Sequence, residues 1–170
     1  MIIEPTLSYK MIADAEPGEL VRIRWGSAAA LCIVLKQDKS TLCAVLRTPD
    51  TSRPFHYSIK QDDRTHCLSY GRGWVLDLTI SDETFPGNNA FSEVSGAIHV
   101  TEGITAIELD RPPGNIQFTP GSFNLQTGDI VEVVTRKSSP VVHWRIWGSQ
   151  SERSSPKSVP VFEMDVRKST

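Results

Sequence analysis

The stretch from residue 115 to residue 148 constrains the fold more strongly than any other part of the chain. Apolar residues recur two positions apart along it, as at 116 and 118, 123 and 125, and 131 and 133. Gly128-Asp129 precedes the central run, and a polar link then leads to an aromatic-rich run at residues 141–147. Alternation with a period of two is typical of antiparallel strands that bury one face and expose the other. The pattern predicts an all-β fold and indicates little about activity.

Short strand-like runs fill most of the chain, and helical periodicity is scarce. Only residues 11–20 suggest a short helix, and Pro17-Gly18 interrupts it. Turn-forming residues, as at positions 86–89, separate the runs. Strands are predicted at residues 19–25, 29–36, 41–47, 54–59, 65–70, 73–80, 96–100, 104–109, 116–118, 129–136, 141–147 and 159–164. Many short strands with such turns favour small β-barrels and sandwiches.

The runs group into two β units. We expect a small barrel-like unit at residues 1–85 and a sandwich-like unit at residues 86–170, packed as one compact domain or as two. Each unit would contain a hairpin, residues 19–23 with 31–35 in the first and 129–133 with 141–146 in the second. The run at 159–164 is expected to be a final edge strand.

Charge is distributed unevenly, although the whole chain carries a formal net charge of only −2. A dedicated nucleic-acid binder would be strongly basic, so the composition does not favour one. Residues 86–135 contain one basic residue against six acids, whereas residues 136–170 contain seven basic residues against three acids. Adjoining segments of opposite charge would steer a protein partner or a neighbouring copy. An ordinary solvated surface is the alternative explanation.

Neither membrane attachment nor secretion is expected. No apolar run approaches the length of about 20 residues that a spanning helix needs, and the N-terminus has neither a basic start nor an apolar segment. We expect a cytoplasmic protein, or one within a particle assembled in the cytoplasm. Cys32 and Cys43 lie in apolar runs and are expected to be small buried hydrophobes.

Residues 18–59 resemble small SH3-like barrels and, more distantly, the MazF/CcdB-type toxin endoribonucleases. The matching order is Gly-Glu-Leu-Val-Arg-Ile at 18–23, an apolar run at 30–35, and residues 41–47 leading into Thr-Ser-Arg-Pro at 51–54. The toxins carry an Arg-Pro pair before the second apolar strand, where this chain has Ser-Ala-Ala-Ala at 27–30. The resemblance implies a small barrel that acts on nucleic acid.

Residues 116–147 are similar to the opening of a cupredoxin or of a bacterial Ig-like domain. Both families carry apolar-x-Pro followed by Leu-x-x-Gly-Asp-x-Val, which occurs here between Phe118 and Val131. His143 falls near the first copper-ligand position, but no Cys and no second His follow it, and a blue-copper site needs both. The resemblance therefore implies a Greek-key sandwich without copper.

No catalytic set, cofactor motif or metal site can be assigned from spacing. Asp62, Asp63, His66 and Cys67 form the densest group of metal-capable side chains, yet a strand would direct His66 and Cys67 to opposite faces. A polar loop that leads into a strand explains the group. We expect no metal, no cofactor and no enzymatic activity.

Alternation also predicts which side chains face solvent. Along residues 141–147, one face carries Val142, Trp144 and Ile146 and suits a core. The other face combines a cation, an imidazole and an indole, which can hold an anion or the carboxylates of a partner; alternatively, the strand at 159–164 covers the indole. The candidate partner-binding residues are His143, Arg145 and Trp147. By the same alternation, His56 and His99 are expected to point outward.

These features favour a non-catalytic binding or assembly module, such as a structural or adaptor subunit of a virion-type or other multi-subunit assembly. Open edge strands need a cover, and a protein partner or a second copy provides one. The alternative is a small barrel acting on nucleic acid, either a toxin-like endoribonuclease or a binder. Its candidate residues are Arg22, Arg24, Arg53, His56 and Lys60. A small-molecule-binding sandwich is a third reading and requires a pocket.

Overall fold

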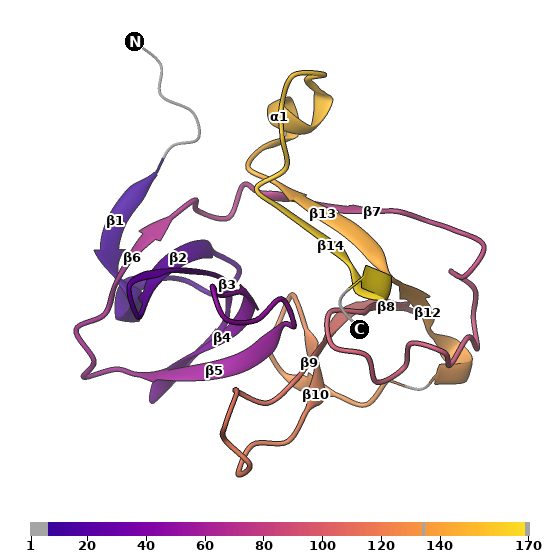
Figure 1. The fold of residues 1–170 in the computed structure, drawn as a ribbon, viewed down its shortest axis with the longest axis horizontal. Coiled ribbons are helices and arrows are strands. Elements are labelled where there is room, and N and C mark those ends of the chain that lie inside the picture. Colours follow the sequence, from indigo (N-terminus) through magenta and orange to yellow (C-terminus); the bar gives the residue numbers. More distant parts are fainter. Residues whose placement is uncertain (1–6, 134, 169–170) are drawn as a thin grey trace.

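The computed structural model describes residues 7–133 and 135–168, whose strands form three antiparallel sheets (Figure 1). The largest sheet has six strands in the order β1-β6-β2-β3-β4-β5. Their bounds in that order are Ser8–Met11, His66–Ser69, Leu20–Trp25, Ala28–Gln37, Ser40–Arg47 and Phe55–Lys60.

The other two sheets come mainly from the C-terminal half. Five strands have the order β11-β10-β9-β8-β12, with bounds Ile130–Val131, Gly121–Asn124, Ile104–Leu109, Ile98–Thr101 and Ser139–Val141. Three strands have the order β14-β13-β7, with bounds Phe162–Asp165, His143–Trp147 and Val75–Leu78. The helical elements are the short helix α1 (Gln150–Ser154) and 3₁₀ turns at Ile12–Asp14, Thr135–Lys137 and Val166–Lys168.

The predicted all-β class is confirmed, with differences in individual elements. The suggested helix at 11–20 reduces to one 3₁₀ turn, because Pro17 and Gly18 prevent a second turn. Residues 116–118 form no strand, and in the run at 129–136 the described residues pair at β11 alone. Strands β1, β10 and β12 were not expected, because each is short and lies among polar residues.

The prediction of a barrel is wrong, since no sheet closes on itself. The six-stranded sheet ends at β1 on one side and β5 on the other, and no pairing joins these two edges in the described ranges. Instead, the start of β5 is linked to the second half of the chain. The amide of His56 donates to the Asp110 carbonyl at 3.1 Å, and the amide of Asp110 donates to the Pro54 carbonyl at 3.0 Å.

One of the two predicted hairpins is confirmed. Strands β2 and β3 pair as expected, with Leu20 opposite Ile33. The second hairpin is wrong, because β11 pairs with β10, whereas β13 pairs with β7 and β14 in another sheet. Between them, β12 pairs with β8 as an edge strand that contains Pro140. Strand β14 lies at an edge, as predicted for the run at 159–164.

Strand β3 is buried on both faces, and this explains its unbroken apolar run. Its odd-numbered side chains, such as Ile33, join a core cluster with Trp144 and other residues of the second half. Its even-numbered side chains, such as Val34, join a second cluster with Ile12 and Phe55 on the far face of the sheet. A strand covered on both sides needs apolar residues at every position rather than at alternate ones.

The two halves of the chain share the larger core cluster. Trp144 is fully buried in it, and its indole N–H donates to the Gly96 carbonyl at 2.8 Å. Val142 and Ile146 are buried with Trp144, which confirms the predicted core face of this strand. Strand β7 precedes the predicted boundary between residues 85 and 86 but pairs with β13 beyond it. The division into two units stays a prediction.

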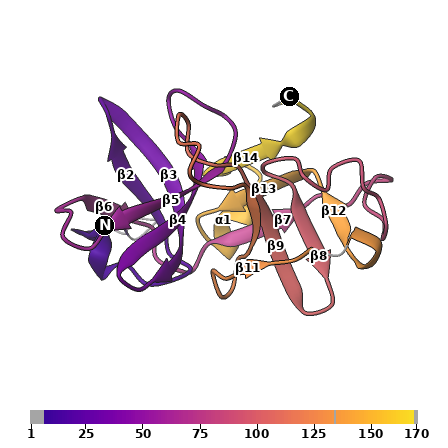
Figure 2. The ribbon, with the colours of Figure 1, turned by 90° about the horizontal axis from the view of Figure 1, so that it is seen from below.

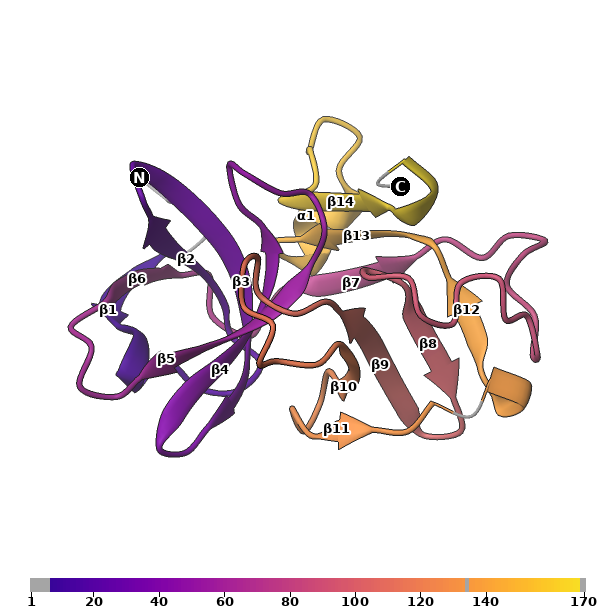
Figure 3. The ribbon, with the colours of Figure 1, turned by 60° about the horizontal axis from the view of Figure 1, so that its bottom comes forward.

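Figures 2 and 3 show how the sheets are arranged. The six-stranded sheet lies at one end of the molecule, β8 and β12 lie toward the other end, and β7, β13 and β14 lie above β9 and β11 in the middle. The three cysteines are buried as free thiols, which confirms the prediction for Cys32 and Cys43. Within the described ranges, no helix is long and apolar enough to cross a bilayer.

Gly128 fixes the approach of the β10–β11 turn to strand β3. Its φ of +71° lies in the region that favours glycine, and a Cβ there would overlap the carbonyl group of Leu35. Next to it, Asp129 accepts a 2.7 Å hydrogen bond from the Lys36 ammonium group. The turn can therefore lie against β3 only when residue 128 has no side chain.

We expect Gly128→Ala to lower the free energy of unfolding by about 2 to 4 kcal/mol, because it adds backbone strain and an overlap in a packed interface. Gly114→Ala is the matched control, since Gly114 has a similar φ of +75° but open space around its Cβ position. Urea unfolding of both variants measures the difference. Equal losses in the two variants would contradict the proposed close approach.

Candidate functional site

A cleft of about 670 Å³ opens beside the five-stranded sheet. It is lined by the end of β9, by β10 and β11, and by the segment at residues 92–95, together with Arg53 and Val166. Leu109, Val131 and Val133 supply apolar surface, and Ser122 supplies a hydroxyl group. A concave site with apolar walls and a few converging polar groups is the usual form of a ligand-binding site.

Four carboxylates converge on this cleft against a single arginine, Arg53. Glu108 belongs to β9 and is 8% exposed, whereas Asp110 follows the same strand and is half-buried. Glu93 and Glu132 are exposed and come from the 92–95 segment and from the end of β11. The acidic character predicted for residues 86–135 is thus concentrated at one place on the surface.

Behind Glu108 lies a buried histidine. The hydroxyl of Ser122, on the neighbouring strand, donates to the Glu108 carboxylate. His99 is completely buried, and its Nε2 lies 3.7 Å from Glu108 Oε1 without a hydrogen-bond partner in the described part of the chain. Its Nδ1 lies 3.4 Å from the Ser138 hydroxyl.

Burial shifts the pKa values of these two groups in opposite directions. Burial raises the pKa of Glu108 above its ordinary value, the Ser122 hydrogen bond lowers it in part, and the charge of Glu93 raises it further. Burial lowers the pKa of His99, against a backbone hydrogen bond with Phe91 that raises it. Each group therefore resists becoming charged, as expected where water is excluded.

The outward orientation expected for His99 and His56 is wrong. His99 is fully buried, and His56 is 6% exposed, with its Nε2 at 2.9 Å from the Thr119 carbonyl oxygen. The rings of Phe118 and Phe123 pack against the His56 ring. Alternation predicts one wet face, whereas here the second half of the chain covers the face that carries His56.

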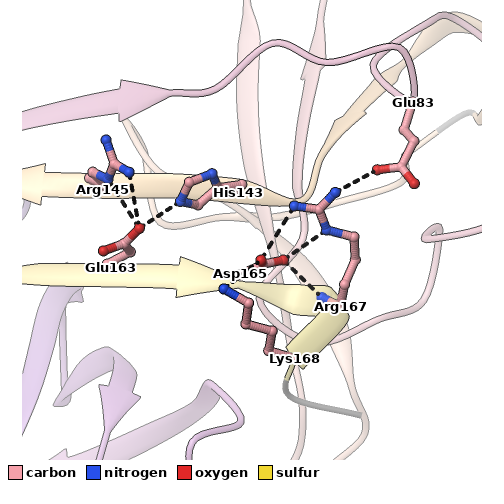
Figure 4. Close-up of polar contacts among 7 residues, drawn as sticks. All are labelled: Glu83, His143, Arg145, Glu163, Asp165, Arg167 and Lys168. Carbon is pink, nitrogen blue, oxygen red and sulfur yellow. Dashed lines mark hydrogen bonds and ion pairs between the residues drawn. The ribbon is translucent and has the colours of Figure 1, made fainter.

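The three predicted partner-binding residues lie at alternate positions of β13, and their polar groups are engaged within the molecule. Figure 4 shows the contacts of His143 and Arg145. Glu163 on β14 accepts hydrogen bonds from His143 at 2.7 Å and from Arg145 at 3.1 Å. These hydrogen bonds lower the pKa of Glu163, and the bond from His143 has the largest effect. Trp147 is 9% exposed, and its indole N–H donates to Asp77 at 3.4 Å. Of the two alternatives left open by the sequence, a covered indole agrees with the burial of Trp147. The partner-binding role of the three residues stays a prediction.

A second ion-pair group continues along the same face (Figure 4). Arg167 donates to Asp165 at 2.9 Å and to Glu83 at 3.4 Å, and Lys168 lies 3.4 Å from Asp165. The hydrogen bond from Arg167 lowers the pKa of Asp165. Most charge on this face is balanced by neighbouring strands and turns.

The alternative nucleic-acid set is not brought together. Arg22 and Arg24 lie on β2, which β3 and β4 separate from β5, the strand that carries His56 and Lys60. Arg53 lines the acidic cleft, and His56 is covered. Within the described ranges, no three of the His, Cys, Asp and Glu side chains are arranged to hold a metal ion.

Comparisons with models of protein families, with curated proteins and with solved structures gave no match to this chain.

Sequence reasoning missed the pairing of His99 with Glu108, although a signal for it exists. Strands β8 and β9 form a tight hairpin in which His99 lies opposite Ala106, so Glu108 is its diagonal neighbour on the same face. Both are polar residues within apolar runs. The convergence of Glu93 and Glu132 depends on contacts between segments distant in sequence and has no such signal.

His99 should make the protein less stable in mild acid. Its folded-state pKa lies below the ordinary value of 6.5, so below that pH the unfolded chain binds a proton that the folded chain resists. As the pH falls from 7.5 to 5.5, this difference lowers the unfolding free energy of the wild-type protein. We expect His99→Gln to lose less stability than the wild type between pH 7.5 and 5.5, as measured by urea unfolding.

Glu108→Gln provides the control of opposite sign. The folded-state pKa of Glu108 is raised above 4.5. The folded wild type therefore gains stability as the pH falls through this folded-state pKa toward 4.5, and the Gln variant should lack this gain. If both variants follow the wild-type pH dependence, the two groups do not titrate as described.

Proposed function

We propose that the protein is a non-catalytic binding module, a structural or adaptor subunit of a larger assembly, and that its acidic cleft holds an extended basic segment of a protein partner. The observation that carries this proposal is the convergence of Glu93, Glu108, Asp110 and Glu132 on one cleft with a single arginine. Complementary charge gives such a surface both selectivity and a fast association rate.

The edge strand beside the cleft supports an extended partner. Strand β11 ends the five-stranded sheet, and the side chain of Ile130 on it is 74% exposed. An edge strand offers free backbone groups to an added strand, and pockets at alternate positions select its side chains. Carboxylates next to apolar side chains suit a segment that alternates basic and apolar residues.

The ion pairs of the C-terminal region favour a separate partner over a second copy of this chain. The basic residues at 136–170 would be the natural counterpart of the cleft, but several are already engaged. Arg153 donates to Asp77 at 2.7 Å, Arg145 to Glu163 and Arg167 to Asp165. Releasing them to reach another copy would break these bonds.

Binding rather than catalysis is supported by the position of the titratable groups. His99 lies behind Glu108 and is fully buried, so a molecule in the cleft does not reach its imidazole. The three cysteine thiols are buried, and burial raises the pKa of Cys43 to about 12. A thiol with such a pKa is a poor nucleophile at neutral pH.

The test uses a synthetic peptide that alternates lysine and valine, with a glutamate–valine peptide as its counterpart, and measures binding by titration calorimetry. We expect the basic peptide to bind and the acidic one not to bind. The Glu93→Gln/Glu132→Gln double variant should bind about tenfold more weakly, since each partly exposed charge contributes up to about 1 kcal/mol. Acidification should also weaken binding, because the raised pKa of Glu108 makes it lose its charge early.

Glu102→Gln is the matched control, because Glu102 is an exposed acid on the β8–β9 turn of the same sheet, outside the cleft. It should leave the affinity unchanged. Equal weakening by Glu102→Gln, or undiminished binding to the double variant, would refute the cleft as the site. Binding of the acidic peptide that is lost in Arg145→Ala would instead place the partner on His143, Arg145 and Trp147.

A further inference from the structure

A second concave surface, of about 880 Å³, lies on the six-stranded sheet and carries charge of the opposite sign. It is formed by β1, β6, β2 and the start of β3, with the loop at residues 63–65. Its charged side chains are Arg22, Arg24 and Arg64 against one acid, Asp63. This surface is separate from the acidic cleft and independent of the function proposed for it.

Two of the three arginines make contacts that hold them in place, and the three form no described ion pair. Arg22 places its guanidinium over the Tyr70 ring, 5.7 Å from the centroid, and Arg24 donates from Nε to the Gly26 carbonyl at 3.1 Å. In residues 7–133 and 135–168, neither of these two nor Arg64 lies within ion-pair distance of a carboxylate. Unpaired guanidinium groups gathered in one hollow are suited to bind phosphate oxygens, often with two hydrogen bonds.

Strand register adds an aromatic platform beside these charges. Tyr9 and Arg22 both lie opposite Leu68, so they flank β6 on one face of the sheet. The Tyr9 ring stacks on the His66 ring, with centroids 5.0 Å apart and planes at 6°. Because Tyr9 is 73% exposed, another planar ring can extend this stack from the solvent side.

We propose that this surface binds single-stranded nucleic acid, with phosphates on Arg22, Arg24 and Arg64 and a base stacked on Tyr9. Arg22 and Arg24 are two residues apart on one strand face, about 6.6 Å along the strand, which is close to the separation of neighbouring phosphates in an extended single strand. A duplex hides its base faces, whereas a single strand offers them for stacking.

The surface contains only two members of the set predicted from sequence. Arg22 and Arg24 belong to it, and Arg53, His56 and Lys60 do not line it. Tyr9, Arg64 and His66 take their place. Of the two nucleic-acid functions expected as the alternative, the proposal keeps the binder and not the endoribonuclease, and it assigns binding to a different set of residues.

The first measurement is the binding of a fluorescein-labelled oligouridylate to the full chain by fluorescence anisotropy at several salt concentrations. For a single strand held by three cations, raising the salt from about 50 to about 200 mM should weaken binding about 20-fold. The Arg22→Ala/Arg24→Ala variant should bind more weakly, and the slope of log K against log salt should become shallower by about 1.4.

Aromatic variants test the stacked base. Tyr9→Ala should weaken binding about tenfold and Tyr9→Phe should leave it nearly unchanged, because the ring and not the hydroxyl supplies the stacking surface. Lys39→Ala is the control for general positive charge, since Lys39 is exposed on the β3–β4 turn of the same sheet but outside the hollow. Unchanged melting temperatures confirm that the variants are folded.

Several outcomes would overturn the proposal. These are an unchanged affinity in Arg22→Ala/Arg24→Ala, an equal loss in Lys39→Ala, and binding of a duplex as tight as that of the single strand. Equally tight binding of uridine monophosphate would show that the surface recognises a small phosphate compound and not a strand.

Discussion

The whole structure depends on the burial of strands β3 and β4 on both of their faces. Ile33, Leu35 and Leu46 point into the core shared with the second half, while Val34 and Val45 point into the smaller core on the other side. Each fully buried side chain of this size contributes about 1.5 to 3 kcal/mol relative to exposure. Because one pair of strands supplies both cores, neither half can reach its observed packing without the other.

This constraint separates what the sequence predicts from what it does not. Local alternation correctly places Trp144 inside, and it locates most strands to within a few residues. It fails for His56, because the method assumes a single wet face and the second half covers the face that carries this residue. It also fails for the second hairpin. Strands β11, β12 and β13 follow one another in sequence but pair with other strands and not with each other, so the turns between them do not determine the pairing.

The two proposed binding surfaces can likewise be predicted only in part from the sequence. Their residue types are visible in the sequence, as in the alternating arginines of β2 and the acids at 86–135. Their grouping is not visible, since Tyr9 meets Arg22 only through the register of β1, β6 and β2. The predicted partner-binding residues of β13 show the reverse case. The sequence suggests that His143 and Trp147 are free to contact a partner, but in the fold Glu163 and Asp77 bind their polar groups. The charged residues that line the two hollows are mainly acidic in one and mainly basic in the other.

Pro140 makes the two edges of the five-stranded sheet different. It lies in the edge strand β12 and has no N–H to donate, and the neighbouring Ser138 carbonyl is already bonded to the amide of Gly87 at 3.2 Å. Strand addition is therefore unfavourable at β12, and β11 is the edge of this sheet that the proposed partner segment would use. In that case the sheet would hold one such segment, because its opposite edge is unsuited to a second.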